Sequence, residues 1–193
     1  MGVLNVTPDS FSDGGKFITP NAALQHVERM INNGADIIDI GAESTRPGAE
    51  IVPVDKERKR IEPVIKAIKK TFNIPVSIDT YKPEIMELGL DLGVEMINDI
   101  YALRQPRAID IVAKSDVMLC LMHMQGTPND MQDKPIYKNI INDVSQFLQE
   151  RIHVCSEFGI DQSRLVIDPG FGFGKTHDNN LKLFQSLDKL KVL

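Results

Sequence analysis

The chain has 193 residues, of which 42% are hydrophobic and 25% are charged. This composition is typical of a globular protein, and the length favours a single domain over residues 1–193. The net charge is −5, with acidic and basic residues mixed along the chain, which argues against a nucleic-acid partner or a membrane surface. No apolar run reaches the ~18 residues of a membrane span.

The two cysteines, Cys120 and Cys155, do not have the spacing of a metal site or a redox motif. Cys120 falls in an apolar run and Cys155 on the apolar face of an expected helix. We therefore expect two buried free thiols, which favours a reducing cytoplasm.

Short apolar runs alternate with amphipathic segments along the whole chain. Six such pairs in succession predict parallel strands joined by crossover helices. The expected strands are 2–5, 35–41, 74–80, 94–100, 116–124 and 163–168, and the expected helices are 19–34, 55–72, 82–93, 105–115, 139–158 and 177–187.

Several residues mark the ends of these helices. Thr19 and Pro20 suit the start of the first helix, and Gly34 suits its end. Gly159 is expected to end the fifth helix. Pro63 lies inside the second helical segment, where we expect it to break or kink the helix.

Two parallel architectures fit this order, an open doubly wound sheet and an eight-unit (β/α)8 TIM barrel. Four expected strands end in an aliphatic residue followed by Asp or Asn. Because alternate strand residues face opposite sides, the polar member faces inward when the aliphatic member packs under the helices. A ring of inward polar groups favours the barrel, although each of them can also simply cap the following turn. The polar members are Asn5, Asp79, Asn98 and Asp168.

Eight strand-helix units take ~250 residues, and six are found here. The expectation is therefore an incomplete TIM barrel of about six units. We expect it to be truncated at the C-terminus and also at the N-terminus, where the first strand has almost no preceding residues.

Two long polar loops are candidates for chemistry. In the first, 5–15, Asn5 offers an oxygen suited to Mg²⁺, and Asp9 can face a cation or a developing positive charge. These residues can equally well only shape turns. In the second loop, 41–50, Arg46 between Thr45 and Pro47 suits an anion, whereas a lone arginine is more often a solvated surface residue.

Asp79, Asn98 and Asp168 together suit a flat heterocycle with a donor-rich edge. A carboxylate accepts two parallel N–H bonds, and an amide offers one donor and one acceptor. Paired carboxylates also occur in glycoside hydrolases, but that chemistry needs neither the Asn nor the arginine loop.

The stretch 168–175, "DPGFGFGK", has neither the glycine spacing of a phosphate loop nor that of a dinucleotide fingerprint. Its glycines instead predict a tight turn that lets a ligand approach the backbone. Phe173 can cover a ring face, and Lys175 can contact an anion or a ring carbonyl, while ordinary packing is the alternative for a phenylalanine. Met122 can pack against a flat ring, and we expect the neighbouring His123 to be a structural hydrogen-bonding residue.

Six motifs, taken in this order, resemble those of the dihydropteroate synthase family. The resemblance runs from residue 2 to about residue 190. The motifs are "GVLNVTPDSFSDGG", "DIGAESTRPGA", "SIDT", "INDI", "MHMQGTP" and "DPGFGFGK".

The resemblance implies a TIM-barrel transferase that moves a pterin-methyl group in folate biosynthesis. Such an enzyme joins 6-hydroxymethyl-7,8-dihydropterin diphosphate to 4-aminobenzoate and releases diphosphate, with Mg²⁺; sulfonamides compete with aminobenzoate. The resemblance also implies a homodimer for the full-length enzyme. A seventh-strand lysine and an eighth-strand Arg-x-His anion site of the family fall beyond residue 193.

Each site residue takes a role from the resemblance. Asn5 would touch Mg²⁺, and Asp9 and Arg46 would be catalytic. Phe11 would close over the aminobenzoate. The remaining substrate-binding residues would be Thr45, Arg46 and Pro47 on the second loop, Asp79, Asn98 and Asp168 at the pterin edge, and Met122, Phe173 and Lys175 around the ring.

Two other functions remain open on the sequence alone. One is the pterin-binding domain of a folate-dependent methyltransferase, although the two long loops suit a second substrate and diphosphate better. The other is a non-catalytic fragment that binds pterin.

Overall fold

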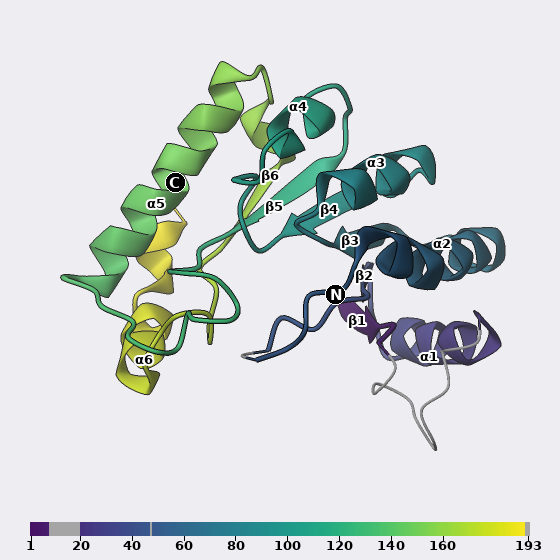
Figure 1. The fold of residues 1–193 in the computed structure, drawn as a ribbon, viewed down its shortest axis with the longest axis horizontal. Coiled ribbons are helices and arrows are strands. Elements are labelled where there is room, and N and C mark those ends of the chain that lie inside the picture. Colours follow the sequence, from purple (N-terminus) through teal and green to yellow (C-terminus); the bar gives the residue numbers. More distant parts are fainter. Residues whose placement is uncertain (8–19, 47, 192–193) are drawn as a thin grey trace.

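The computed structural model describes residues 1–7, 20–46 and 48–191. Within these residues, strands and helices alternate along the chain (Figure 1). The strands are β1 (Gly2–Asn5), β2 (Ile38–Gly41), β3 (Val76–Asp79), β4 (Met96–Asp99), β5 (Met118–Met122) and β6 (Leu165–Asp168). The helices are α1 (Pro20–Asn32), α2 (Val54–Thr71), α3 (Pro83–Asp91), α4 (Ala108–Val112), α5 (Ile140–Glu157) and α6 (His177–Gln185), with short 3-10 turns at Gln162–Arg164 and Leu187–Leu190.

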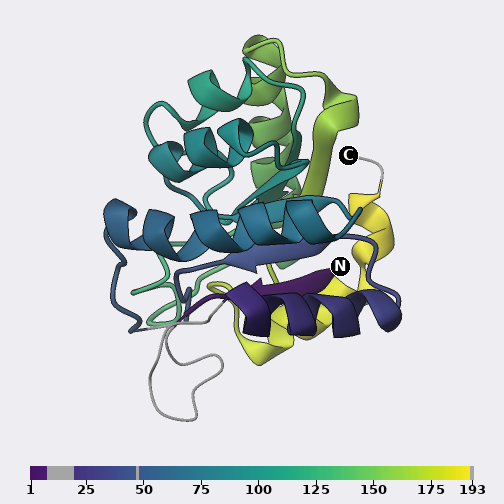
Figure 2. The same cartoon turned by 90° about the vertical axis from the view of Figure 1, so that its right-hand side faces the viewer.

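The six strands form one parallel sheet in the order β1-β2-β3-β4-β5-β6. A doubly wound sheet reverses its strand order at a switch point, whereas this order never reverses. Figures 1 and 2 show the helices gathered on the outer side of the sheet, as in a barrel wall. The expected incomplete TIM barrel of six strand-helix units is confirmed, with β1 and β6 at the two edges of the described sheet.

The strand register shows which side chains share a face. Residues paired across parallel strands point the same way, and one row of the sheet contains Asn5, Asp79, Asn98 and Cys120. Asp168 lies one row higher on the same face, paired with Met122. The alternate row is aliphatic and faces the helices; its members Leu4, Ile40, Ile78, Ile97 and Leu119 are at most 1% exposed.

Local sequence signals explain several helix ends. Gly34 has a φ of +90° just beyond α1, and Gly159 has a φ of +75° just beyond α5, the left-handed geometry that glycine tolerates. The Asn139 side chain accepts hydrogen bonds from the backbone N–H groups of Ile141 and Asn142, both at 3.1 Å, and so caps α5. Thr19, the expected cap of α1, lies outside the described residues.

The expected break at Pro63 does not occur, because α2 runs unbroken from Val54 to Thr71. A proline inside a helix costs about 3 kcal/mol through its missing N–H and its ring clash. Burial of one apolar helix face offsets this cost; the residues of that face are Ile61, Val64, Ile65 and Ile68, each at most 1% exposed.

Both cysteines are buried and free, as the sequence predicts. Within the part of the chain that the structure describes, no helix is long and apolar enough to span a membrane.

Candidate active site

The carboxyl ends of the strands carry the polar side chains of the candidate site. Asn5 at the end of β1 is exposed, and Asp79, Asn98 and Asp168 are half-buried. The shared face of these four residues confirms that they point to the inner side of the sheet.

The Asp79 carboxyl group lies in an acidic and poorly solvated position. Burial raises its pKa well above the ordinary value of 3.8, and the charges of Asp39 and Asp99 raise it further. A hydrogen-bond donor from a ligand would favour the ionised carboxylate and so lower the pKa again.

Asp39, on β2, is a site residue that sequence reasoning missed. Its carboxylate accepts a hydrogen bond from the Asn98 side-chain amide at 3.1 Å, and burial raises its pKa. This bond fixes the orientation of the Asn98 amide. The available signal was an aspartate inside the otherwise apolar run "IIDIG".

Cys120 lies on the same inner face as the acidic groups. Its pKa is raised to about 12, first by burial and then by the charges of Asp168, Asp39 and Asp79. The strand register places Asp79 beside Asn98, with Asp168 one row higher on that face. Their meeting around one ligand stays a prediction.

Two cavities flank the loop between β2 and α2. One, of about 290 Å³, is lined by Asn5, Thr45, Arg46 and Asp79 among others. The other, of about 590 Å³, is also lined by Arg46 and lies against α2. Arg46 is therefore on the boundary of both, and the smaller cavity unites four of the predicted site residues. Neither cavity is lined by Asn98 or Asp168.

The Arg46 loop makes a tight turn. The N–H of Ala49 donates to the carbonyl oxygen of Arg46 at 3.0 Å, and Gly48 has a φ of +77°. A glycine at this position permits the turn, because the left-handed conformation costs other residues about 1–2 kcal/mol.

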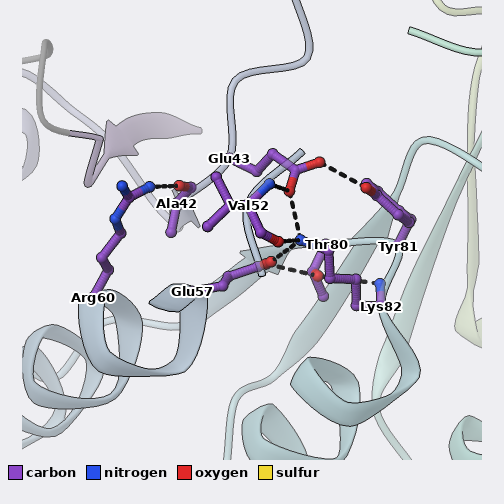
Figure 3. A network of polar contacts seen from close by, with 8 residues as sticks. All are labelled: Ala42, Glu43, Val52, Glu57, Arg60, Thr80, Tyr81 and Lys82. Carbon is purple, nitrogen blue, oxygen red and sulfur yellow. Dashed lines mark hydrogen bonds and ion pairs between the residues drawn. The ribbon is translucent and has the colours of Figure 1, made fainter. Parts of the chain in front are cut away.

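A buried ionic network holds the base of this loop, and sequence reasoning missed it entirely (Figure 3). The Lys82 ammonium donates to Glu43, Glu57 and the carbonyl oxygen of Val52. Tyr81 donates its hydroxyl proton to Glu43 at 2.7 Å. These residues come from three separate segments, so no sequence spacing indicates them.

The glycine-rich turn after β6 folds back on Asp168. The N–H of Gly170 donates to the Asp168 carboxylate at 2.7 Å, and the N–H of Phe173 donates to the Gly170 carbonyl at 3.1 Å. Gly170, Gly172 and Gly174 all have positive φ angles, which confirms the predicted tight turn.

Lys175 holds this turn from inside. It is only 3% exposed, and its ammonium donates to the carbonyl oxygens of Gly170 and Phe173 at 2.7 and 3.0 Å. Its Nζ also lies 3.0 Å from Nδ1 of His123, and burial lowers the Lys175 pKa to about 7. The structure thus gives Lys175 a structural role that the sequence did not indicate, and its contact with a ligand stays a prediction.

Met122 and Phe173 come together in one apolar cluster above the sheet. Met122 is buried and Phe173 is partly buried. Asp79, Asn98 and Asp168 form the acidic rim at the carboxyl ends of the strands. Because Met122 is paired with Asp168 in the sheet, this cluster lies beside the acidic rim and offers an apolar surface for a ring. The other members are Ile100, Met124, Met131, Tyr81 and Tyr101.

Asn5 has the donor type that Mg²⁺ prefers, and it opens into the same cavity as Arg46. In the described residues, no group of three or more His, Cys, Asp and Glu side chains is arranged to hold a metal ion. Of the described residues, Asn5 is the one that fits the predicted Mg²⁺ by donor type, and the Mg²⁺ itself stays a prediction. Three predicted site residues, Asp9, Phe11 and Pro47, lie outside the described residues.

The fold and the rim define the class. A parallel barrel wall with carboxylates, an amide and a cationic loop at its carboxyl end has the layout of a TIM-barrel enzyme site. The family model for the pterin binding enzymes matches residues 1–193. The chain therefore belongs to the family of pterin-binding enzymes.

Dihydropteroate synthases are among the relatives of this chain. The synthase of Clostridium beijerinckii is 46% identical over 100% of this chain and 70% of its own length. That of Escherichia coli is 46% identical over 97% of this chain and 66% of its own length. The chain thus spans about two thirds of the length of these proteins.

Solved structures agree. The dihydropteroate synthase of Xanthomonas albilineans with 4-aminobenzoic acid superposes with a TM-score of 0.92, at 49% identity, over 100% of this chain and 68% of that one. The Yersinia pestis enzyme with a sulfonamide drug gives a TM-score of 0.92 at 45% identity, over 98% of this chain and 69% of that one. The family that the sequence motifs indicate is confirmed.

Proposed function

We propose that this chain carries the pterin pocket and the diphosphate-binding loop of a dihydropteroate synthase. The reaction joins 6-hydroxymethyl-7,8-dihydropterin diphosphate to 4-aminobenzoate and releases diphosphate. The observation that carries the proposal is the strand register, which places Asp79, Asn98 and Asp168 on one inner face at the carboxyl ends of β3, β4 and β6. The 46% identity to synthases favours this function over that of a methyltransferase domain.

The acidic rim would read the amino-pyrimidine edge of the pterin. Asp79 and Asp168 would accept N–H bonds, and Asn98, with its amide oriented by Asp39, would pair with a ring donor and acceptor. Met122 and Phe173 would cover the ring faces. An N–H donor of the ligand would offset the burial and the neighbouring acids that raise the pKa of Asp79.

The smaller cavity would hold the diphosphate. Arg46 pairs well with phosphate oxygens through its planar fork, and Thr45 adds a hydroxyl donor. Asn5 would hold Mg²⁺, which when bound supplies charge neutralisation to the leaving diphosphate.

The chemistry is an alkyl transfer at the pterin methylene carbon. The C–O bond to diphosphate breaks, and its electron pair leaves on the diphosphate oxygen, where Arg46 offsets the new charge. The aminobenzoate nitrogen then forms the C–N bond and releases a proton to solvent. The carboxylates around the ring stabilise the positive charge on the pterin, and Asp9 and Phe11 are proposed to act from the first loop. Closing that loop would exclude water from the cation.

Three further features remain proposals. We expect the two buried free thiols to stay reduced in a cytoplasmic setting. The substrates are small molecules, and the homodimer implied by the family is expected for a chain of full family length.

Binding of 6-hydroxymethylpterin, measured by isothermal titration calorimetry, tests the proposal. We expect one site per chain, and at least tenfold weaker binding in Asp79→Asn and in Asp168→Asn, because each loses a charged acceptor worth about 1.5–3 kcal/mol. Asp116→Asn is the matched control, since Asp116 is exposed at the opposite end of β5. Unchanged pterin affinity in both site variants would show that pterin does not bind at Asp79 and Asp168. A chain of full family length carrying the same substitutions should lose dihydropteroate formation in parallel.

A further inference from the structure

We infer that Lys82 is a positioning residue that holds the Glu43–Val52 loop in the geometry that presents Thr45 and Arg46 to the diphosphate. This inference rests on the proposed function for its consequence, but the clamp itself can be tested without it. The residues of the clamp are Glu43, Val52, Glu57, Tyr81 and Lys82 (Figure 3).

Lys82 is 8% exposed, and its ammonium group makes all three of the hydrogen bonds that it can donate. Its three protons are matched by three acceptors, namely Oε2 of Glu43, Oε2 of Glu57 and the carbonyl oxygen of Val52, at 2.5, 2.5 and 2.6 Å. One acceptor belongs to the start of the loop, one to its end and one to α2. The lysine itself precedes α3, so it joins the loop to two fixed helices.

Glu43 completes the closure of the loop. Its Oε2 also accepts the N–H of Val52 at 2.8 Å, and its Oε1 accepts the Tyr81 hydroxyl at 2.7 Å. Both ends of the segment are therefore tied to the same lysine and to each other. Between the ties, the described side chains of Thr45 and Arg46 are half-buried and exposed, respectively.

Among the described residues, the tip of the loop has few hydrogen bonds of its own. The N–H of Arg46 lies 3.4 Å from the Ser44 hydroxyl oxygen, and one turn bond joins Ala49 to Arg46. Because such local bonds stabilise a loop only slightly, its position depends on its ends. Arg46 lines both cavities, so a shift of the loop changes the geometry of the diphosphate subsite.

The charges of the clamp determine how it must be tested. Two buried carboxylates face one ammonium, and the pKa of Glu57 is raised by burial and by Glu43. Lys82→Met alone leaves two carboxylates without their cation and is expected to destabilise the whole fold. Lys82→Met combined with Glu57→Gln removes one of these charges. The Gln oxygen still accepts the bond that Thr80 donates to Glu57 at 3.0 Å, so this double variant loses the three Lys82 contacts with less damage to α2.

Limited proteolysis and ligand binding separate positioning from folding. Glu-C protease cuts after glutamate, and Glu50 is an exposed glutamate within the loop. In the double variant we expect cleavage between Glu50 and Ile51 to be at least tenfold faster. We also expect at least fivefold weaker binding of inorganic diphosphate with Mg²⁺, and 6-hydroxymethylpterin affinity within twofold of the unmodified chain. Lys66→Met, at an exposed lysine of α2, the helix that carries Glu57, should change none of these values.

Equal cleavage and equal diphosphate affinity in the folded double variant would overturn the inference. Hydrogen exchange on the unmodified chain adds a readout that needs no variant. The Val52 amide, bonded to Glu43, should exchange at least tenfold more slowly than that of the exposed Ile51, and equal rates would also overturn it. If the unmodified chain binds neither pterin nor diphosphate, the proposed function fails, while the cleavage and exchange rates still decide whether the clamp exists.

Discussion

At the scale of single residues, the proposed pterin pocket depends on the ionisation of Asp79. The carboxyl accepts two parallel N–H donors only when it is ionised. Its pKa is raised well above 3.8 by burial and by the surrounding acids, so it becomes protonated at a higher pH than an ordinary aspartate. Pterin binding should therefore weaken as the pH falls through that raised pKa, by about tenfold per pH unit below it.

Calorimetric titrations with 6-hydroxymethylpterin at a series of pH values check this dependence. The unmodified chain should lose affinity on the acidic side. Asp79→Asn should bind weakly at every pH and show a much flatter profile. A profile of the unmodified chain that is flat down to pH 4 would contradict an essential carboxylate with a raised pKa.

Some properties of these single residues could be predicted from the sequence, and others could not. The shared inner face of Asp79, Asn98 and Asp168 could be predicted, because strand alternation fixes the face on which a residue lies. Asp39 was missed because a single aspartate within an apolar run does not reveal its partner. The contacts that Lys82 and Lys175 make within the fold could not be predicted, because they depend on carbonyl oxygens and acids from other segments.

At the scale of elements, the turn after β6 offers two glycines with the same backbone geometry and different surroundings. Gly170 has a φ of +68°, and a Cβ placed there would lie 2.0 Å from the His123 carbonyl oxygen. Gly172 has a φ of +81° and nothing within 4 Å of such a Cβ. Alanine is strained at both positions but collides only at Gly170.

We expect Gly172→Ala to lower the free energy of unfolding by about 1–2 kcal/mol, the cost of a left-handed alanine. Gly170→Ala should lower it by at least ~3 kcal/mol and weaken pterin binding, because the turn that carries Phe173 must move. Urea unfolding of the two variants measures the difference. Equal losses would show that the close contact with His123 does not support the turn.

The order and type of the elements could be predicted because apolar runs and helical spacing repeat six times. The course of α2 could not, since the penalty of Pro63 is local whereas the burial that outweighs it comes from the tertiary packing of Ile61 and Ile65. The base of the Arg46 loop likewise depends on contacts between three elements.

At the scale of the whole molecule, the described sheet has two edges, β1 and β6. Val3 on β1 is 54% exposed and Val166 on β6 is 40% exposed, although both belong to inward-facing rows. Unpaired edge strands with exposed apolar residues promote pairing with another chain.

We therefore expect the 193-residue chain to self-associate as its concentration rises. Sedimentation velocity at 10 and 100 μM is the measurement. Val3→Lys and Val166→Lys should reduce the association, because edge lysines oppose strand pairing. A monodisperse monomer at both concentrations would show that the edges are protected.

The central claim is that side chains from β3, β4 and β6 meet around one pterin ring. A nuclear magnetic resonance titration with 6-hydroxymethylpterin tests it most directly, through the carboxyl carbons of Asp79 and Asp168 and the side-chain amide of Asn98. The account predicts that all three signals shift along one saturation curve with a common Kd. Shifts with separate saturation curves, or signals that stay unchanged at saturating ligand, would contradict it.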